Sequence, residues 1–591
     1  MTEETFRRDI QKIMIMKDKD MQAWEEIKNI PQILKVNSLR FGSSTAIDSV
    51  DGTSYSYQEL DRSARFLASM LHSAGIAKGS KVAILSENTP HWTLSYFGIL
   101  TTGATTVPIL PDFRGSEIIT ILEHAEARAI FISGKLLSRL DAGLPKEIEM
   151  VINLDDFQVL DVENGKIVPP KSEAGKLEKL NVSNDSFPGE ESFYQAEPDE
   201  LASIIYTSGT TGRSKGVMLS HLNILSNAKQ SATVHVVTHE DSFLSMLPLA
   251  HSYECTIGMV VPLLNGAKVH YIEKPPTAAY LAPLFKKLKP TTLLTVPLIM
   301  EKIFAGKIKP SLYGKPVMKT LMKFGPTRRL LSKAASKKLQ EFFGGRLRFF
   351  GIGGAPLAPD VERFLLDGKF PYAIGYGLTE TAPMLAGFDP QHAIYRSVGE
   401  VMDGVTMRID NPDPVTHEGE IVVQGSNIMK GYYKEPEKTA EVFTDDGFFR
   451  TGDLGYIDDN GIIYIRGRLK NMILGANGEN IYPEEIEAVI NKEDIVSESL
   501  VMEVKGKLVA MVHLKVEVME ERFKHLQENA ADFQQQIQEK SDEVLAELMV
   551  QVNQHVARNS KLQLMILQAQ PFEKTPTQKI KRFVYHQLAN T

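Results

Sequence analysis

The stretch KVAILSENTPHWTLSYFGILTTGATTVPILPDFRGSEIITILEHAEARAIFIS, residues 81–133, alternates short apolar runs with segments of helical spacing. Continuous apolar runs of this length are typical of parallel strands that are buried on both faces. The alternation recurs after residue 201, so it predicts an α/β fold built from parallel strand–helix–strand units. The predicted strands are Lys81–Leu85, Thr106–Ile109 and Ala129–Ser133, and the predicted helices are 91–102 and Glu117–Glu126.

Size and composition set wide limits on the class of protein. The chain has 591 residues, of which 43% are hydrophobic and 24% are charged, as in an average soluble globular protein, so general disorder is not expected. A single hydrophobic core stops growing at roughly 250–300 residues, so several domains are expected. The formal net charge of −8 argues against a dedicated nucleic-acid binder, which is usually basic.

Cysteine usage and hydropathy predict the compartment. Cys255 is the only cysteine, so the chain forms neither an intrachain disulfide nor a multi-thiolate zinc site. The first residues show no apolar stretch of the kind that a signal peptide has. The longest uncharged stretch, Asn88–Pro111, is broken by Pro, Gly and Thr and indicates buried structure rather than a membrane span. We therefore expect a cytoplasmic protein, with a peripheral position on the inner face of the membrane left open.

The organisation changes towards the C-terminus. From about residue 404 the predicted strands become short and alternating, which indicates a small antiparallel β unit. A boundary near Arg468–Asn471 separates a predicted domain of residues 1–468 from one of residues 469–591. The predicted elements of the second domain are two strands, Ser497–Val504 and Lys507–Val516, and a helical stretch over 519–558. That stretch fits either a dimer contact or a domain insertion.

The strongest functional signal is Tyr206-Thr-Ser-Gly-Thr-Thr-Gly-Arg-Ser-Lys-Gly216, which follows the apolar strand Leu201–Ile205. Its glycines let backbone N–H groups face outward, and its five Ser and Thr hydroxyls add donors and candidate magnesium ligands. Lys215 adds a positive charge, so the loop suits a polyphosphate; a surface loop without function is the competing interpretation. It is not a Walker A loop, because Ser214 and Gly216 flank the lysine in place of Gly and Ser or Thr.

This segment resembles the phosphate loop of the adenylate-forming superfamily, which comprises acyl-CoA synthetases, nonribosomal-peptide adenylation domains and firefly luciferase. Further motifs of that family follow in the expected order, and the similarity extends from about residue 30 to the end. They are Gly353–Pro356, Gly375–Thr381, Arg450–Asp453, Gly467–Lys470, Glu479–Ile486 and Lys574–Arg582. The resemblance implies an α/β fold with a large N-terminal domain of two doubly wound sheets plus a small β-barrel, and a mobile α+β C-terminal domain.

The same resemblance implies a site for ATP and Mg²⁺. Tyr376 offers a flat face for adenine, and the Asp453 carboxylate accepts hydrogen bonds from the ribose hydroxyls. Arg468 supplies a rigid fork of donors for the ribose or the phosphate. Glu380 and Thr207 are implied as oxygen ligands of the metal. Together with Thr207, the remaining nucleotide-binding residues implied are Ser208, Gly209, Thr210, Thr211, Gly212, Lys215, Gly353, Gly354, Ala355, Gly377 and Thr379.

Lys579 is the predicted catalytic cation. A carboxylate that attacks the α-phosphate of ATP brings two anions together, and a cation aimed at the phosphate oxygens lowers that barrier. A basic tail without function is the alternative. The family has Gly before this lysine, whereas this chain has Gln578, but the neighbouring residues keep the register of the motif.

The acyl site predicts the substrate class. His251 lies in Pro248–Glu254, which resembles the acyl-site motif of the family, and is predicted to act beside the substrate carboxylate. Adenylation domains for amino acids have an Asp for the substrate ammonium at the next position, where this chain has Ser252. A buried ammonium without a partner is costly, so an amino-acid substrate is not expected.

The predicted reaction has two steps. A carboxylate and MgATP give an acyl-adenylate and pyrophosphate; the C-terminal domain then swings about the hinge residue Lys470, and coenzyme A attacks the adenylate. The overall pattern resembles a long-chain fatty acid–CoA ligase. The sequence leaves open acyl carrier protein as acceptor, a medium-chain or aryl acid as substrate, and luciferase-type oxidation. A rival of another class is an ADP-forming, membrane-associated kinase or ATPase. Acyl chain length and oligomeric state are not fixed by the sequence.

A basic stretch stands out in this acidic chain. Residues 302–340 contain 11 Lys and Arg and no Asp or Glu. Apolar residues recur there at helical spacing, and Leu331, Leu339 and Phe343 are expected to insert into lipid. A basic amphipathic stretch suits an anionic membrane surface, and long-chain members of the family have an insertion of similar character. The alternative is a solvated basic face that packs on the large domain.

Overall fold

The computed structural model describes residues 23–50, 52–163, 165–168, 194–207, 214–272, 274, 276–474, 480–515, 518–519, 533–575 and 579–590. Within this part the chain forms two compact units. The first consists of described residues from Met1–Thr207, Ser214–Met407 and Val423–Phe449, and the second of those from Arg408–Val422 and Arg450–Thr591. The predicted boundary at residue 468 falls inside the second unit and remains a prediction.

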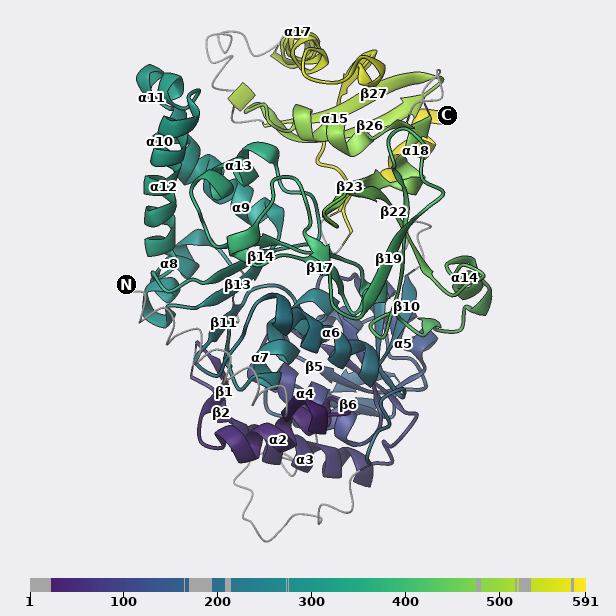
Figure 1. Ribbon diagram of the computed structural model, residues 1–591. Coiled ribbons are helices and arrows are strands. Elements are labelled where there is room, and N and C mark those ends of the chain that lie inside the picture. The colour runs from purple at the N-terminus through teal and green to yellow at the C-terminus, as the bar shows by residue number, and fades with distance from the viewer. Residues whose placement is uncertain are drawn as a thin grey trace, which may run out of the picture. The chain divides into compact units, whose positions relative to one another are not determined.

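Residues 81–133 form the middle of a nine-stranded sheet in the first unit (Figure 1). Strand β3 pairs in parallel with β4 and β5, and β4 pairs in parallel with β9. All five residues of β4 are buried, as expected for a parallel strand covered on both faces. The bounds are β3 Lys81–Leu85, α4 Pro90–Thr101, β4 Thr105–Ile109, α5 Gly115–Ala125, β5 Ala127–Ile132 and β9 Leu201–Thr207. The predicted strand–helix–strand units are therefore confirmed.

Local chemistry explains where these elements begin. Pro90 occupies the first turn of α4, and the Thr89 hydroxyl accepts a hydrogen bond from the Trp92 N–H. The order of the sheet is β21-β10-β9-β4-β3-β5-β6-β7-β8. Its outer strands are β21 Gly431–Tyr432 and β10 Lys215–Ser220 on one side, and β6 Met150–Asn153, β7 Val159–Glu163 and β8 Lys166–Val168 on the other.

A seven-stranded sheet forms the other half of the first unit, in the order β15-β14-β13-β11-β12-β1-β2. Its strands β11, β13, β14 and β15 run parallel, and their side chains form rows across the sheet. One row consists of Phe243, Thr292 and Phe349; two residues further along lies a second row of Leu294, Gly351 and Ala373, on the same face. The bounds are β1 Thr45–Ser49, β2 Ser54–Ser56, β11 Ser242–Ser245, β12 Lys268–Tyr271, β13 Thr292–Thr295, β14 Phe349–Ile352 and β15 Tyr372–Ile374.

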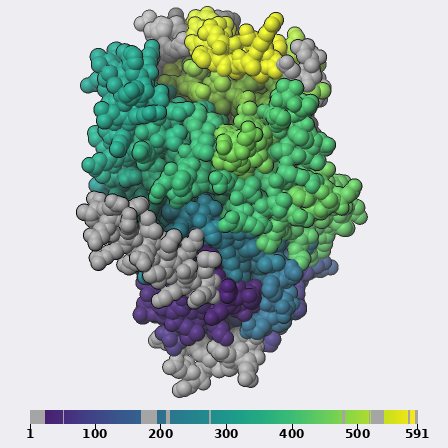
Figure 2. Space-filling view, in the orientation of Figure 1, coloured from purple at the N-terminus to yellow at the C-terminus, as the bar shows by residue number. Residues whose placement is uncertain are grey.

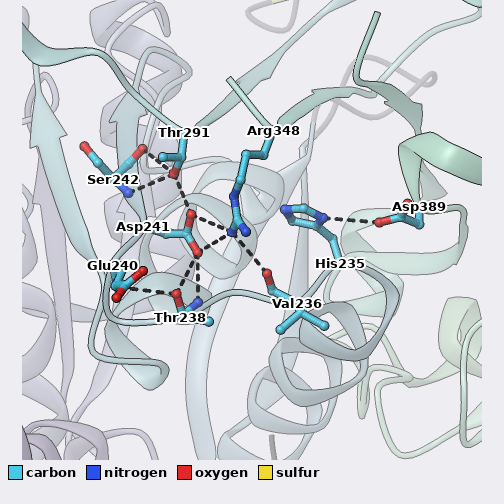
Figure 3. Close-up of polar contacts among 9 residues, drawn as sticks. All are labelled: His235, Val236, Thr238, Glu240, Asp241, Ser242, Thr291, Arg348 and Asp389. Carbon is cyan, nitrogen blue, oxygen red and sulfur yellow. Dashed lines mark hydrogen bonds and ion pairs between the residues drawn. The ribbon is translucent and has the colours of Figure 1, made fainter. Parts of the chain in front are cut away.

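A buried carboxylate ties the amino ends of three of these strands together (Figure 3). Asp241 directly precedes β11, Thr291 precedes β13 and Arg348 precedes β14. The Asp241 carboxylate is 3% exposed and accepts hydrogen bonds from Arg348 Nη2 at 2.6 and 2.7 Å and from Thr291 Oγ1 at 2.7 Å. It also accepts one from the Thr238 N–H at 2.9 Å. One side chain therefore holds three strand ends in register.

The basic stretch folds differently from the prediction in one respect. It forms a run of short helices followed by α12 (Gly325–Phe342), and Phe343, at the end of α12, is 1% exposed. The Phe343 ring packs against Phe285 and Phe350, Leu339 is 3% exposed, and Leu331 packs on the same core. The expectation that these three side chains insert into lipid is wrong, because they are the core-facing stripe of α12. Elsewhere too, none of the helices in the described part of the chain is long and apolar enough to cross a bilayer.

The second unit includes most of a four-stranded sheet, a three-stranded sheet and the short pair β24 (Ile473–Leu474) and β25 (Asn480–Ile481). The small β unit predicted after residue 404 is a four-stranded sheet in the order β19-β20-β22-β23, in which β22 and β23 are antiparallel. The three-stranded sheet β26-β27-β28 packs with helices around an apolar core, which is the α+β arrangement implied for the C-terminal part. The bounds are β19 Val405–Asp410, β20 Gly419–Gly425, β22 Phe449–Ile457, β23 Ile463–Arg468, α15 Pro483–Ile490, β26 Val496–Val504, β27 Lys507–Leu514, α17 Phe533–Asn553, β28 Leu564–Leu567 and α18 Arg582–Asn590.

Two boundaries in the second unit differ from the prediction. The second predicted strand ends at Leu514 instead of Val516. The helical stretch predicted over 519–558 contains α17, which ends at Asn553, and residues 520–532 lie outside the described part.

Candidate active site

The predicted phosphate loop joins two neighbouring strands of the nine-stranded sheet. Thr207 ends β9 and Lys215 begins β10, and the two residues lie directly opposite each other in the antiparallel pair. Residues 208–213, which include Ser208, Gly209, Thr210, Thr211 and Gly212, lie outside the described residues. Antiparallel pairing at its base therefore brings the predicted metal hydroxyl and the predicted phosphate cation together.

A tyrosine links the lysine to the predicted metal carboxylate. The Lys215 ammonium lies 4.5 Å from the centre of the Tyr432 ring, within the range of a cation–π contact. The Tyr432 hydroxyl donates a hydrogen bond to Glu380 Oε1 at 2.9 Å. Because Tyr432 pairs with Val217 across β10 and β21, strand register fixes this link. No motif in the sequence marks Tyr432 as a site residue.

The chemistry of this cluster suits a magnesium ion that arrives with a nucleotide. Mg²⁺ prefers oxygen ligands and is usually bound through one or two carboxylates together with substrate phosphates. Glu380 offers a carboxylate and Thr207 a hydroxyl. Within the described residues no group of three or more His, Cys, Asp or Glu side chains gathers to hold a metal by itself. When bound, the ion would neutralise phosphate charge; Glu380 and Thr207 are the residues that would hold it.

The predicted adenine motifs follow β14 and β15 at their carboxyl ends. Gly353, Gly354 and Ala355 directly follow β14, and Gly354 has a φ of +90°, which favours glycine. Tyr376, 9% exposed, begins the short strand β16 (Tyr376–Gly377). A Cβ on Gly377 would lie 1.9 Å from the Pro383 carbonyl oxygen, so only glycine fits. Thr379 and Glu380 follow in a short 3₁₀ turn over Thr379–Thr381.

An apolar cavity lies on the face formed by the two rows of the seven-stranded sheet. The empty space in it, which includes open solvent at its mouth, is about 580 Å³. The lining runs from Phe243, Thr292 and Phe349 in the first row to Gly375, the residue directly before Tyr376. Tyr253, directly before the π-helix Glu254–Val260, and Ile257 within that helix also line the cavity. The end of α6 (His221–Val234) lines it as well. An apolar pocket therefore ends beside the predicted adenine motif.

The predicted acyl-site histidine is held by its own segment. His251 Nδ1 accepts a hydrogen bond from the Tyr253 N–H at 3.2 Å. That bond leaves Nε2 as the protonated nitrogen of the neutral ring. His251 thus lies two residues from Tyr253, which lines the cavity.

The predicted ribose and hinge residues gather in the second unit. Asp453 and Arg468 are opposite each other across β22 and β23, and Arg468 Nε lies 2.8 Å from Asp453 Oδ1. Lys470 follows in the 3₁₀ turn Leu469–Asn471. Partial burial and the neighbouring cations Arg468 and Lys579 lower the pKa of Lys470 to about 8. The structure therefore places the predicted hinge lysine and the predicted catalytic lysine in one cationic cluster.

Lys579 is held by contacts with Thr575. The Thr575 N–H donates to the Lys579 carbonyl at 2.8 Å, and the Lys579 N–H donates to Thr575 Oγ1 at 3.2 Å. Lys574 and Ile580 form an isolated antiparallel bridge, and Lys574 also pairs with Glu498 at 2.6 Å. Gln578, the departure from the family pattern, lies outside the described residues.

Comparison with known proteins decides the family. A family model described as AMP-binding enzyme matches residues 34–433. The chain belongs to the AMP-binding enzyme family. Family membership confirms the resemblance to adenylate-forming enzymes inferred from the sequence, and the roles of individual residues remain predictions.

The relatives of this AMP-binding enzyme include acid–CoA ligases. A long-chain-fatty-acid–CoA ligase of Drosophila melanogaster is 28% identical over 508 residues, which cover 79% of this chain and 73% of that protein. An enzyme of Rhodococcus jostii, named as the CoA ligase of a methyl-dioxo-octahydroindenyl propanoyl group, is 29% identical over 492 residues, covering 83% and 88%. ATP-bound MatB from Rhodopseudomonas palustris is 24% identical, with a TM-score of 0.71 over 92% of this chain and 96% of that one, and it confirms the α/β fold.

One acidic residue beside the cavity was not singled out from the sequence. Glu254 begins the π-helix Glu254–Val260 and is 1% exposed. Burial raises the pKa of its carboxyl to about 8, although a hydrogen bond with Ser245 opposes the shift. Gly258 leaves the room that this carboxyl fills, since a Cβ there would lie 2.6 Å from the carboxyl carbon. The only sequence signal was the acid within an otherwise apolar motif.

Replacement of Glu254 by Gln is expected to change how stability depends on pH. The folded pKa lies above the unfolded value, so the folded chain keeps a proton that the unfolded chain releases. Stability is therefore lost as the pH rises from about 4.5 to about 8, by about 1.4 kcal/mol per pH unit. Glu254→Gln removes this slope. Urea midpoints measured at pH 5, 6, 7 and 8 test it, with the exposed Glu123→Gln as the matched control. Parallel pH curves for wild type and Glu254→Gln would contradict the assignment.

Proposed function

We propose that the protein activates a fatty acid with ATP, giving an acyl-adenylate and pyrophosphate, and then transfers the acyl group to coenzyme A. The observation that carries the proposal is the apolar cavity that ends at Gly375, directly beside Tyr376 of the predicted adenine motif. An acid whose chain fills this cavity places its carboxylate next to the nucleotide. The names of the long-chain relatives support a fatty acid, and the apolar lining suits one.

The first step joins the acid to the α-phosphate. A carboxylate oxygen forms a bond to phosphorus, and the bond to the pyrophosphate leaving group breaks. Lys215 and Glu380, linked through Tyr432, are proposed to hold the phosphates and their metal ion. His251 is proposed to donate from Nε2 to the substrate carboxylate. Lys579 is proposed to stabilise the negative charge that develops on the phosphate oxygens.

The second step breaks the new mixed anhydride. The thiol of coenzyme A gives up its proton to solvent and its sulfur forms a bond to the acyl carbon. The bond from that carbon to the phosphate oxygen breaks, and AMP leaves with the electron pair. We propose that Lys470 acts as the hinge about which the C-terminal part rearranges between the steps. In this scheme the cluster of Lys470 and Lys579 belongs to one state of the second unit.

Product analysis tests the reaction class. With a panel of straight-chain and aryl acids, and with coenzyme A and acyl carrier protein as alternative acceptors, we expect AMP and pyrophosphate in amounts equal to the thioester. Coenzyme A is the expected acceptor. Formation of ADP would contradict the proposal and favour a kinase or ATPase. A preference for acyl carrier protein would show that the proposed acceptor is wrong, and a preference for aryl acids would show that the proposed substrate class is wrong. Neither result would contradict the adenylation step.

Lys579→Ala is expected to separate the two half-reactions. Loss of one donor to the transition state lowers adenylation by roughly 10²–10³-fold, measured as pyrophosphate exchange. Transfer from supplied acyl-adenylate to coenzyme A should be nearly unchanged, because Lys579 is assigned to the first step alone. Lys561→Ala, an exposed lysine of the same unit, is the matched control. An equal fall in the rates of both half-reactions would contradict the assignment of Lys579 to the first step.

The basic stretch supports a second proposal, association with an anionic membrane. Three apolar residues of its described part are exposed: Val317 is 71% exposed, Phe324 60% and Leu330 70%. Neighbouring lysines are exposed as well. Figure 2 shows the segment, in teal, on the surface of the first unit. Exposed apolar and basic side chains together suit a lipid surface. These three residues replace the buried stripe that the sequence argument had chosen.

Vesicle sedimentation tests this association. Binding to anionic vesicles should exceed binding to neutral ones and weaken with salt, because each cation near the surface contributes about 1 kcal/mol. Replacing Lys333, Lys337 and Lys338 by Glu should reduce binding by at least about tenfold. The same charge change at the exposed residues Lys146, Lys505 and Lys561 is the control. Binding that does not depend on lipid charge would show that the stretch is a solvated structural face.

A further inference from the structure

The apolar cavity of the first unit has two ends with different surroundings. One end lies at Gly375, directly before Tyr376 of the predicted adenine motif. The other end lies at the row of Phe243, Thr292 and Phe349, near the amino ends of their strands. A fatty acid whose carboxylate faces the nucleotide therefore directs the tail of its chain towards that row.

Strand register gives the length of the cavity between these ends. Thr292 pairs with Phe349, and Gly375 lies four residue levels further along the parallel strands. At about 3.3 Å per residue this is about 13 Å. An extended chain advances roughly 1.1–1.2 Å per bond, so roughly ten to twelve bonds span the cavity from end to end. A chain of about twelve carbons therefore fills it.

The His235 ring lies at the distal end, beside Phe349. His235 directly follows α6 and lines the cavity, and its ring stacks on that of Phe349 with 4.5 Å between ring centres. The Asp389 side chain contacts His235, is 29% exposed and does not belong to the cavity lining. The His235 ring therefore separates the cavity from a carboxylate at the molecular surface.

Polar contacts hold this ring in place. His235 Nδ1 lies 3.4 Å from Asp389 Oδ2, a contact that Figure 3 shows. Asp389 is itself fixed, because its Oδ1 accepts a hydrogen bond from the Gln391 N–H at 2.9 Å. The carbonyl of the next residue, Val236, accepts a hydrogen bond from Arg348 Nη2 at 3.4 Å. Both the ring and the backbone at this end of the cavity are therefore anchored.

We propose that His235 forms the distal end wall of the acyl pocket, so that chains of up to roughly twelve carbons fit and longer chains do not. This inference rests on the proposed function and names the chain length that its site accepts. A longer chain meets a ring that Phe349 and Asp389 hold in place, and extra methylene groups in a filled site displace side chains at a cost in free energy. The long-chain relative of Drosophila melanogaster carries a name that favours the opposite expectation, so measurement decides between geometry and name.

A panel of saturated acids tests the inference. Decanoic, dodecanoic, tetradecanoic and hexadecanoic acids are compared by kcat/KM for pyrophosphate exchange, each below the concentration at which it forms micelles. The wild type should favour dodecanoic over hexadecanoic acid by about tenfold or more. A smaller preference, or the reverse preference, would overturn the inference.

Variants locate the wall. His235→Ala removes the ring and should lower the ratio of dodecanoic to hexadecanoic activity by about tenfold, because the longer acid then fits. Asp389→Ala leaves the ring but removes its anchor, and should lower the ratio by a smaller factor. His239→Ala is the matched control and should keep the wild-type ratio, because His239 is exposed and does not line the cavity. An unchanged ratio in His235→Ala, or in Asp389→Ala if the first protein does not fold, would overturn the inference.

The two levels of proposal fail differently. If no acid yields AMP and pyrophosphate, the proposed function itself is wrong. If hexadecanoic acid is activated as well as dodecanoic acid, adenylation stands and only the chain-length limit is wrong. A general loss of structure in a variant lowers the rates with all acids alike, so the ratio of two acids reports on the end wall.

Discussion

Four parallel strands, β11, β13, β14 and β15, share one register, and that register fixes the distance between the adenine motifs and the deep end of the cavity. The Asp241 carboxylate holds the amino ends of three of them, through Arg348 and Thr291. Because successive side chains alternate between faces, a shift by one residue would move Thr292 and Phe349 out of the cavity. The polar cluster at the strand ends therefore positions an apolar site that it does not itself line.

The sequence predicted what depends on local patterns. Continuous apolar runs located β3 and β5 to within two residues at each end, because a strand buried on both faces admits few polar residues. The order of the motifs predicted the family, and some of these motifs lie at a strand end or turn whose geometry requires their glycines. Gly377 is an example, since its neighbour Pro383 leaves no room for a side chain.

What the sequence did not predict depends on contacts between distant residues. Tyr432 contacts both Lys215, which is 217 positions away in the sequence, and Glu380, which is 52 positions away. No local pattern marks Tyr432. The stripe of Leu331, Leu339 and Phe343 has helical spacing that suits lipid and core equally well. The contacts of Phe343 with Phe285 and Phe350 show that it faces the core. Periodicity shows that a face is apolar, but not what covers it.

Some of the buried polar atoms that lack a partner within the described part of the chain belong to residues at the cavity. The buried Glu254 carboxyl lies in a π-helix next to Tyr253. Glu254 and the lining residues Ser231, His235 and Thr292 each have one buried polar atom that has no partner within the described residues. Proteins tolerate such violations mainly where function requires them, because each lowers stability. Fully apolar replacements would make a more stable fold, as isosteric removal of unpaired polar groups generally does.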